Sequence, residues 1–247
     1  MIKLSKRMKA VASMVTPGNR LCDVGTDHGY VPIALLQRGK ITSAIAMDIN
    51  EGPLSKAKEN IIRNNLTDKV QIRLSDGTHA LEIGEVDTIL IAGMGGELII
   101  RILQEGEEVC KSVDEIILQP QSDIDKVRKY IRDNGYNIVD EDMVFEDGKY
   151  YPMMKIVLGE YALTNKKLSQ DIINVCDIYG PFLLKNGHPV LRKYLVKQHS
   201  QLNNILENLM KQKETDKITN RIEEIKREIN FNESAYSIMG AIKNAGI

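Results

Sequence analysis

Short apolar runs alternate with helical patterns along the first part of the chain. Five apolar runs, each bounded by turn-forming residues, predict buried strands at 20–24, 43–48, 70–74, 86–92 and 115–119. Amphipathic or apolar helical patterns lie before, between and after these strands, at 3–15, 30–38, 53–65, 97–103 and 123–133. The 86–92 run is almost wholly apolar, which is typical of a strand covered on both faces. The alternation therefore predicts an α/β fold whose parallel strands are joined by right-handed crossovers.

The pattern changes after residue 135. Two strand-like runs, 136–145 and 149–158, are joined by Glu146-Asp147-Gly148, and Asp-Gly favours the tight turn of an antiparallel hairpin. A parallel sheet closed by such a hairpin resembles the order of elements in S-adenosylmethionine-dependent methyltransferases. That resemblance implies a Rossmann-like, seven-stranded class I methyltransferase sheet.

No strand pattern follows Glu160. Two apolar stripes at helical spacing are separated by the polar segment 212–217: Leu191, Leu195, Leu202, Ile205, Leu206 and Leu209, then Ile218, Ile222, Ile225 and Ile229. They predict an antiparallel coiled-coil hairpin, with a further helix over 167–184. We therefore expect two domains, 1–160 and 161–247. Such stripes pair within one chain or between chains, and we expect pairing within the chain, hence a monomer.

Composition excludes several classes of protein. The chain has no 18-residue apolar run and no apolar signal-peptide core, so we expect no membrane segment. Its three cysteines are scattered, which argues against a zinc site or disulfide framework and predicts a cytoplasmic protein without metal. Residues 161–247 carry 13 Lys and Arg against 9 Asp and Glu. This basic tail fits a polyanionic partner and, equally, a solvated helical surface.

The segment Asp23-Val24-Gly25-Thr26-Asp27-His28-Gly29 follows the first strand and predicts a nucleoside-cofactor cradle. Its glycine spacing is neither that of dinucleotide binding nor that of a phosphate loop, and no lysine follows it. A methionine-derived cofactor has no phosphate, and its amine suits Asp23. Gly25 would let the cofactor approach the backbone, and Gly29 would allow close strand–helix packing.

Acidic residues after the next two strands extend this cradle. Asp48 would accept both ribose hydroxyls, and Asp76, followed by Gly77, lies where this fold class contacts the adenine amino group. The alternative is that Asp23 and Asp76 cap helices or turns and that the glycines only make bends.

The end of the fourth strand, Ile91-Ala92-Gly93-Met94-Gly95-Gly96-Glu97, should face the transferred methyl group. It lacks the Asn/Asp-Pro-Pro-aromatic motif of enzymes that methylate exocyclic amines. Three glycines in four residues would let a flat base lie close to the methyl donor, with Gly93 and Met94 beside the reacting atoms. A flexible turn before a helix is the alternative.

The whole chain resembles the bacterial tRNA (adenine(22)-N1)-methyltransferase family. Four segments carry the resemblance: Leu4-Ser5-Lys6-Arg7, Asp23 to Tyr30, Ile91 to Gly96 and Leu118-Gln119-Pro120-Gln121, with the closing helical hairpin. The resemblance implies an S-adenosyl-L-methionine cofactor, a tRNA substrate and methylation of ring N1.

That chemistry needs little from the protein beyond positioning. N1 of adenine is unprotonated at neutral pH, so its lone pair attacks the methyl group directly. The product is cationic, so a carboxylate would stabilise it or accept an amino proton; Asp27 is the first candidate and His28 the second. His28 could equally be a polar residue that opens a helix near solvent.

The target base lies in a folded region of tRNA and would have to be flipped out of its stack. Tyr30, Tyr150 and Tyr151 could hold it, although packing is the default role of the last two. Phosphate contacts should come from basic side chains. The candidates are Lys166, Lys167, Arg192, Lys193 and Lys197 in the tail, and Lys6, Arg7 and Lys9 near the cradle, where Arg7 could instead meet the cofactor carboxylate.

Two other functions remain open on the residues alone. One is a methyltransferase that acts on a small molecule or a protein, which the nearly neutral net charge favours. The other is a non-catalytic interaction protein whose helical hairpin recruits a partner while the sheet senses a nucleoside.

Overall fold

The computed structural model describes residues 2–159, 168–213 and 215–239 of the 247-residue chain. The chain divides into two compact units, Met1–Tyr161 and Ala162–Ile247. The first contains the sheet and the second is helical over its described residues.

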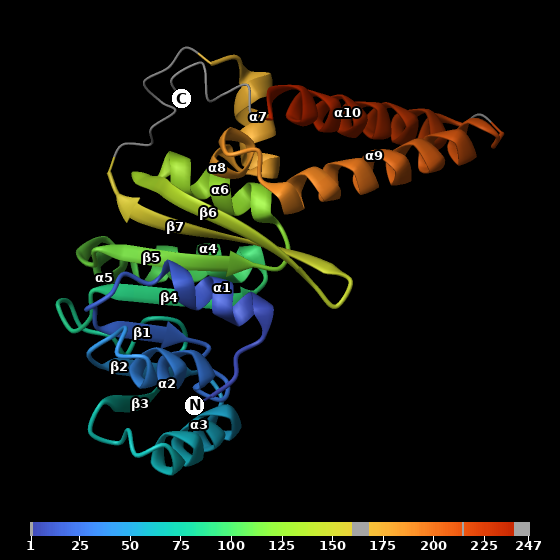
Figure 1. Cartoon of the computed structure of the whole chain (residues 1–247). Helices are drawn as coiled ribbons and strands as arrows, with labels where there is room; N and C mark the ends of the chain where they lie inside the picture. Colours follow the sequence, from blue (N-terminus) through green and yellow to red (C-terminus); the bar gives the residue numbers. More distant parts are fainter. Residues whose placement is uncertain (1, 160–167, 214, 240–247) are drawn as a thin grey trace. The chain divides into compact units, whose positions relative to one another are not determined.

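A seven-stranded sheet forms the centre of the first unit (Figure 1). Its strands are β1 (Leu21–Val24), β2 (Ala44–Asp48), β3 (Val70–Leu74), β4 (Thr88–Met94), β5 (Glu115–Pro120), β6 (Tyr136–Glu146) and β7 (Lys149–Leu158). They lie in the order β3-β2-β1-β4-β5-β7-β6. Strands β1 to β5 pair in parallel, whereas β7 is antiparallel to both β5 and β6. The predicted Rossmann-like sheet with a closing hairpin is confirmed.

Helices cover both faces of this sheet. Those of the first unit are α1 (Lys6–Met14), α2 (Tyr30–Gln37), α3 (Glu51–Arg63), α4 (Gly96–Glu105), α5 (Glu107–Ser112) and α6 (Ile124–Asp133). In Figure 1, α1 and α2 lie in front of the sheet and α4 and α6 behind it. The apolar sides of α1 and α2 pack with β1 and β2 in one buried core, which rigidly supports the β1–α2 turn.

Three local predictions were wrong. The short helix α5 was not expected, because six residues are too few for a helical period to stand out. The fourth strand, which was expected to end at residue 92, runs to Met94, and α4 starts at Gly96, so only Gly95 lies between them. The single helix expected over 167–184 is broken, because Gly180 at φ +93° ends α7 (Gln170–Tyr179) and Pro181 begins α8 (Pro181–Lys185).

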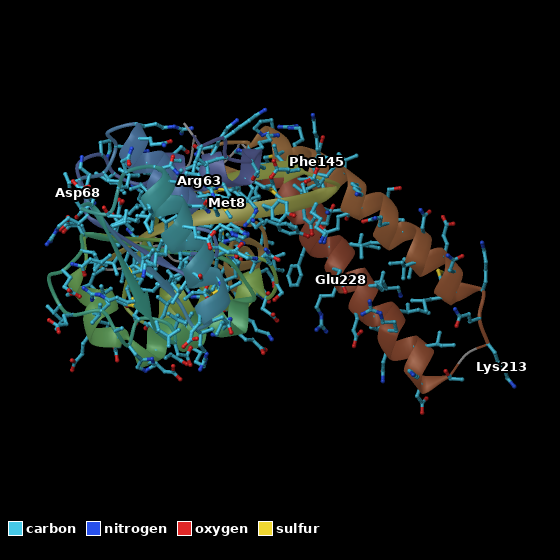
Figure 2. The ribbon with its side chains drawn as sticks, turned by 90° about the horizontal axis from the view of Figure 1, so that it is seen from below. Met8, Arg63, Asp68, Phe145, Lys213 and Glu228 are labelled. Atoms are coloured by element: carbon cyan, nitrogen blue, oxygen red, sulfur yellow. The ribbon has the colours of Figure 1, made fainter. Side chains whose placement is uncertain are left out.

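The second unit contains a long helical hairpin. Its arms, α9 (Pro189–Met210) and α10 (Asp216–Ile238), lie side by side in Figure 1 and pack closely against each other. Figure 2 marks the link between them at Lys213 and the side of α10 at Glu228. Leu202, Ile225 and Ile229 form a buried cluster inside the hairpin. Ile205, expected in the stripe, is instead 41% exposed.

Candidate functional site

A cavity of about 340 Å³ lies between the start of α1, the β1–α2 turn and β4. The carboxyl ends of parallel strands form the ligand-binding edge of folds of this kind. The cavity brings together six of the residues selected from the sequence: Arg7, Asp23, Gly25, Asp27, His28 and Tyr30.

The β1–α2 turn that lines this cavity is fixed by backbone bonds. The N–H groups of Gly25 and Thr26 both donate to the carbonyl oxygen of Met47, at 2.8 and 2.9 Å. Gly25 and Gly29 have φ values of +71° and +69°, which favour glycine. A β-carbon at Gly29 would lie 3.4 Å from that of Ala57 in α3, so Gly29 also permits close packing.

Asp23 is a buried carboxylate that forms no ion pair with any residue that the structure describes. The residue is 5% exposed, and its Oδ2 accepts a 2.7 Å hydrogen bond from the Thr26 hydroxyl. Burial raises the pKa of Asp23 to about 6, and the nearby Asp48 carboxylate adds to the effect. A cationic group in the cavity would stabilise the ionised form. This site therefore fits a ligand ammonium group.

Asp48 ends β2 and is also buried. Its Oδ1 accepts a hydrogen bond from the Asn50 N–H at 3.0 Å, and its Oδ2 accepts one from the Asp27 N–H at 3.3 Å. These bonds fix the carboxylate while each oxygen keeps a further lone pair. Asp48 does not line the cavity itself, but its geometry suits two vicinal hydroxyls.

The structure does not bring Asp76 and Gly77 into the cavity. The Asp76 carboxylate is paired with Arg101 of α4 at 3.1 Å. Gly77 packs on α4, where a β-carbon would lie 3.1 Å from Ile102. Their predicted contact with an adenine ring stays a prediction, and any such contact by the Asp76 carboxylate competes with Arg101.

Asp27, His28 and Tyr30 border the cavity. Asp27 has a φ of +53°, and its side chain is 68% exposed. Its Oδ2 lies 3.6 Å from Nε2 of His28, whose ring stacks on Tyr30 with centroids 5.2 Å apart. An acid–base pair and an exposed aromatic face thus lie next to each other at the cavity.

A β-bulge at the end of β4 explains the glycines of this segment. The register with β5 shifts between Ala92 and Met94, and Gly93 has a φ of +82°. Bulges of this kind re-aim side chains near active sites. The Met94 side chain turns toward the β1–α2 turn, where its Cε lies 2.2 Å from the position of a β-carbon on Gly25. Ala92 lines the cavity, whereas Gly93 and Met94, which follow it, are not among the lining residues.

Sequence reasoning missed the residues that hold Arg7. Its Nη1 donates to Oε1 of the buried Gln119 at 2.7 Å, and its guanidinium lies 5.3 Å from the ring centroid of Tyr151. The Arg7 N–H donates to Oε2 of Glu146 at 3.1 Å. The Gln119-Pro120-Gln121 segment at a strand end was the available signal.

Other predicted substrate contacts lie outside the cavity. Tyr150 pairs with Phe145 across the β6–β7 hairpin, with ring centroids 4.6 Å apart. Figure 2 marks Phe145 on the hairpin and Met8 on α1. The Lys6 Nζ donates to the Phe145 carbonyl at 3.2 Å, and Lys9 is exposed.

In the second unit, Arg192, Lys193 and Lys197 are exposed on α9. The Arg192 guanidinium lies 5.6 Å from the ring centroid of Tyr236 on α10. Arg192, Lys193 and Lys197 lie within two turns of one helix, which suits a polyanion. Lys166 and Lys167 fall outside the described residues.

Two features are absent from the described part of the chain. Within residues 2–159, 168–213 and 215–239, no group of three or more His, Cys, Asp or Glu side chains could hold a metal ion. Within the same ranges, no helix has both the length and the apolarity needed to cross a membrane.

Comparisons with known proteins agree with the fold. Residues 4–154 match the family model described as a methyltransferase domain. The chain is 30% identical to the tRNA (adenine(22)-N(1))-methyltransferase of Bacillus subtilis (strain 168), covering 91% of this chain and 93% of that one.

Solved structures of related proteins also match most of the chain. The Streptococcus pneumoniae protein Sp1610 in complex with S-adenosyl-L-methionine is 36% identical, with a TM-score of 0.81, and covers 94% of this chain and 99% of its own. M. capricolum TrmK in complex with S-adenosyl-homocysteine is 27% identical, with a TM-score of 0.80, over 96% of this chain and 99% of its own.

Proposed function

The chain belongs to the tRNA (adenine(22)-N(1))-methyltransferase family, and on that basis we propose that it transfers a methyl group from S-adenosyl-L-methionine to N1 of adenine 22 in tRNA. The observation that carries the proposal is the cavity at the carboxyl edge of the sheet, where Asp23, Arg7 and Asp27 converge. Residues 1–160 would bind the cofactor and the base, and residues 161–247 would dock the tRNA body.

The polar groups at this edge fit each part of the cofactor. Asp23, buried and without an ion pair among the described residues, takes the amino group, and the Arg7 guanidinium takes the carboxylate. Asp48 accepts the two ribose hydroxyls. When bound, S-adenosyl-L-methionine supplies an electrophilic methyl group on its sulfonium sulfur. Gly25 and Gly29 keep the turn close to it, and Asp76 with Gly77 would contact its adenine.

The same cavity offers what the target base requires. The lone pair on adenine N1 attacks without a base, so the protein mainly holds the ring in line with the methyl group. Tyr30, stacked on His28, provides an exposed aromatic face for a flipped base. The exposed Asp27 carboxylate stabilises the positive charge that develops on the ring, and the His28 ring lies beside it, with Nε2 at 3.6 Å from the Asp27 Oδ2.

Affinity for the tRNA body comes from phosphate contacts. Arg192, Lys193 and Lys197 on α9 are the described candidates in the second unit. Lys166 and Lys167 add to them, and Tyr150 would contact a nucleotide from the β6–β7 hairpin. Each contact with a phosphate releases counterions, so binding should weaken steeply with salt.

The direct test is nucleoside mass analysis of unmodified tRNA before and after incubation with the protein and S-adenosyl-L-methionine. We expect one N1-methyladenosine per tRNA, and none in a matched tRNA that carries guanine at position 22. A protein that binds the cofactor but leaves the first tRNA unmodified would contradict the proposal. Methylation at another adenine would contradict only the position.

A further inference from the structure

The two glutamines of Gln119-Pro120-Gln121 have different surroundings. Gln119 is buried, and both ends of its carboxamide are occupied: Oε1 accepts from Arg7 at 2.7 Å, and Nε2 donates to the Pro120 carbonyl at 2.9 Å. Gln121 is exposed, and in the part of the chain that the structure describes its carboxamide makes no hydrogen bond. Its carboxamide is therefore available to a ligand.

The backbone of Gln121 is fixed beside the bulge at the end of β4. Its N–H donates to the carbonyl oxygen of Met94 at 2.8 Å, which ties the end of β5 to the bulge of β4. A β-carbon at Gly93 would lie 3.6 Å from Nε2 of Gln121 and 3.4 Å from Nη1 of Arg7. Because Gly93 has no side chain, both polar groups border the space above it. Arg7 and Ala92 line the cavity next to this space.

We propose that Gln121 is a specificity-determining residue that recognises the target adenine through its N6 and N7 atoms. This inference rests on the proposed function. The carboxamide oxygen accepts a hydrogen bond from the N6 amino group while the carboxamide N–H donates to N7, the pairing by which glutamine recognises adenine. N1 lies at the other edge of the ring, so the methyl acceptor stays free.

The same geometry discriminates against guanine. Guanine presents acceptors at both O6 and N7, so the acceptor oxygen of the carboxamide would face a second acceptor without a hydrogen between them. Gln119 cannot perform this role, because its carboxamide is already bonded to Arg7 and Pro120. The division of roles explains why two glutamines flank one proline at this strand end.

The test is a thermodynamic cycle between Gln121 and N7 of the base. The tRNA carries either adenosine or 7-deazaadenosine at position 22, and the enzyme is either wild type or Gln121→Met, which keeps the length of the side chain. We expect the deaza base to lower kcat/KM of the wild type about tenfold, within the range of such base contacts. Gln121→Met should lower kcat/KM for normal tRNA by about the same factor, with no further loss on the deaza base.

Controls separate recognition from folding. Gln104→Met, at an exposed position of α4, should leave both rates unchanged, and Gln121→Met should keep the wild-type Kd for the cofactor. The inference is overturned if the two losses multiply, or if neither change alters kcat/KM while wild type methylates the normal tRNA. A wild type that leaves the normal tRNA unmodified would instead overturn the proposed function, and this inference with it.

Discussion

A hydrogen bond of 2.7 Å from Nη1 of Arg7 to Oε1 of Gln119 joins the first helix of the chain to the end of β5. The guanidinium is also held over Tyr151, and the N–H of Arg7 is bound by Glu146. The planar cation therefore has one orientation at the cavity wall. This pre-organisation matters because we propose that Arg7 binds the cofactor carboxylate.

Replacement of Gln119 should weaken cofactor binding through Arg7. We expect Gln119→Leu to raise the Kd of S-adenosyl-L-methionine about tenfold, since a hydrogen bond to a charged group contributes about 1.5–3 kcal/mol. Gln119→Glu keeps an acceptor for Arg7 but sets a buried carboxylate against the Pro120 carbonyl and competes with the cofactor carboxylate for Arg7, so it should not restore the affinity. Calorimetric titration measures both. When Arg7 is already replaced by alanine, Gln119→Leu should cause no further loss of cofactor affinity. If the affinity losses of the two substitutions are fully additive, Gln119 does not act through Arg7.

Gly25 should be intolerant of alanine for two reasons that a control separates. A β-carbon there would meet Met94 Cε at 2.2 Å, and the φ of +71° is strained for other residues. Gly39, at φ +65°, has nothing within 4 Å of such a carbon. The strained φ should cost each alanine variant about 1–2 kcal/mol of stability. The contact with Met94 should add a further loss in Gly25→Ala alone. Only Gly25→Ala should also abolish cofactor binding; equal affinities in the two variants would show that the turn does not contact the cofactor.

The alternation of apolar runs was enough to predict the sheet, because a buried parallel strand is recognised from a short run of residues that are adjacent in sequence. The same reasoning placed Asp23 and Asp48 at the carboxyl edge. It failed at Gly93 and Met94, because the strand was expected to end at residue 92 but continues through a bulge. Pairing with β5, which is distant in sequence, decided that outcome.

Side-chain partners were beyond prediction for the same reason. The Arg7–Gln119 bond spans 112 positions, and the Asp76–Arg101 pair spans 25. No periodicity encodes such contacts. The sequence therefore identified which residue types could bind a cofactor. It did not show that Asp76 is already paired with Arg101 or that Gln119 orients Arg7.

Loss of the Asp27 charge should slow methyl transfer without affecting cofactor binding. Asp27 has a φ of +53°, which asparagine tolerates, so Asp27→Asn keeps the backbone. We expect kcat to fall about 10- to 100-fold, since acid–base and electrostatic terms of this kind contribute at least that much. Asp147→Asn, at another exposed aspartate with φ +48°, is the matched control and should leave kcat unchanged. An unchanged kcat in Asp27→Asn would exclude the role.

The basic side chains of α9 should set the salt dependence of tRNA binding. Replacing Arg192, Lys193 and Lys197 by alanine should weaken tRNA binding at least tenfold. The slope of log K against log salt should become less steep by about 0.9 for each lost contact with duplex phosphate. Filter binding at several salt concentrations measures this. The same replacement at Lys56, Lys58 and Arg63 of α3, which are exposed, removes equal charge. An equal effect from both sets would indicate a general charge effect and not a docking surface.

Asp23 should make the cofactor-free protein less stable as pH rises. Burial raises its pKa from 3.8 to about 6, so the native state binds the proton more tightly than the unfolded state does. The resulting stability is fully present below pH 3.8 and is lost as pH rises through 6. At 1.36 kcal/mol per pKa unit the loss is at most about 3 kcal/mol. Asp23→Asn removes this pH dependence. Urea unfolding should therefore show the free energy of unfolding of the variant rising relative to that of wild type between pH 4 and pH 7.

The same titration should act in the opposite direction on cofactor binding. A ligand ammonium group pairs with the ionised carboxylate, so the affinity of wild type for S-adenosyl-L-methionine should rise with pH through about 6. Asp23→Asn should bind weakly at every pH and lose this dependence. Its gain in stability at pH 7 together with a loss of affinity would mean that the buried charge is kept for the ligand at a cost to the fold. A variant that binds the cofactor as wild type does, with the same pH profile, would assign the titration to another group.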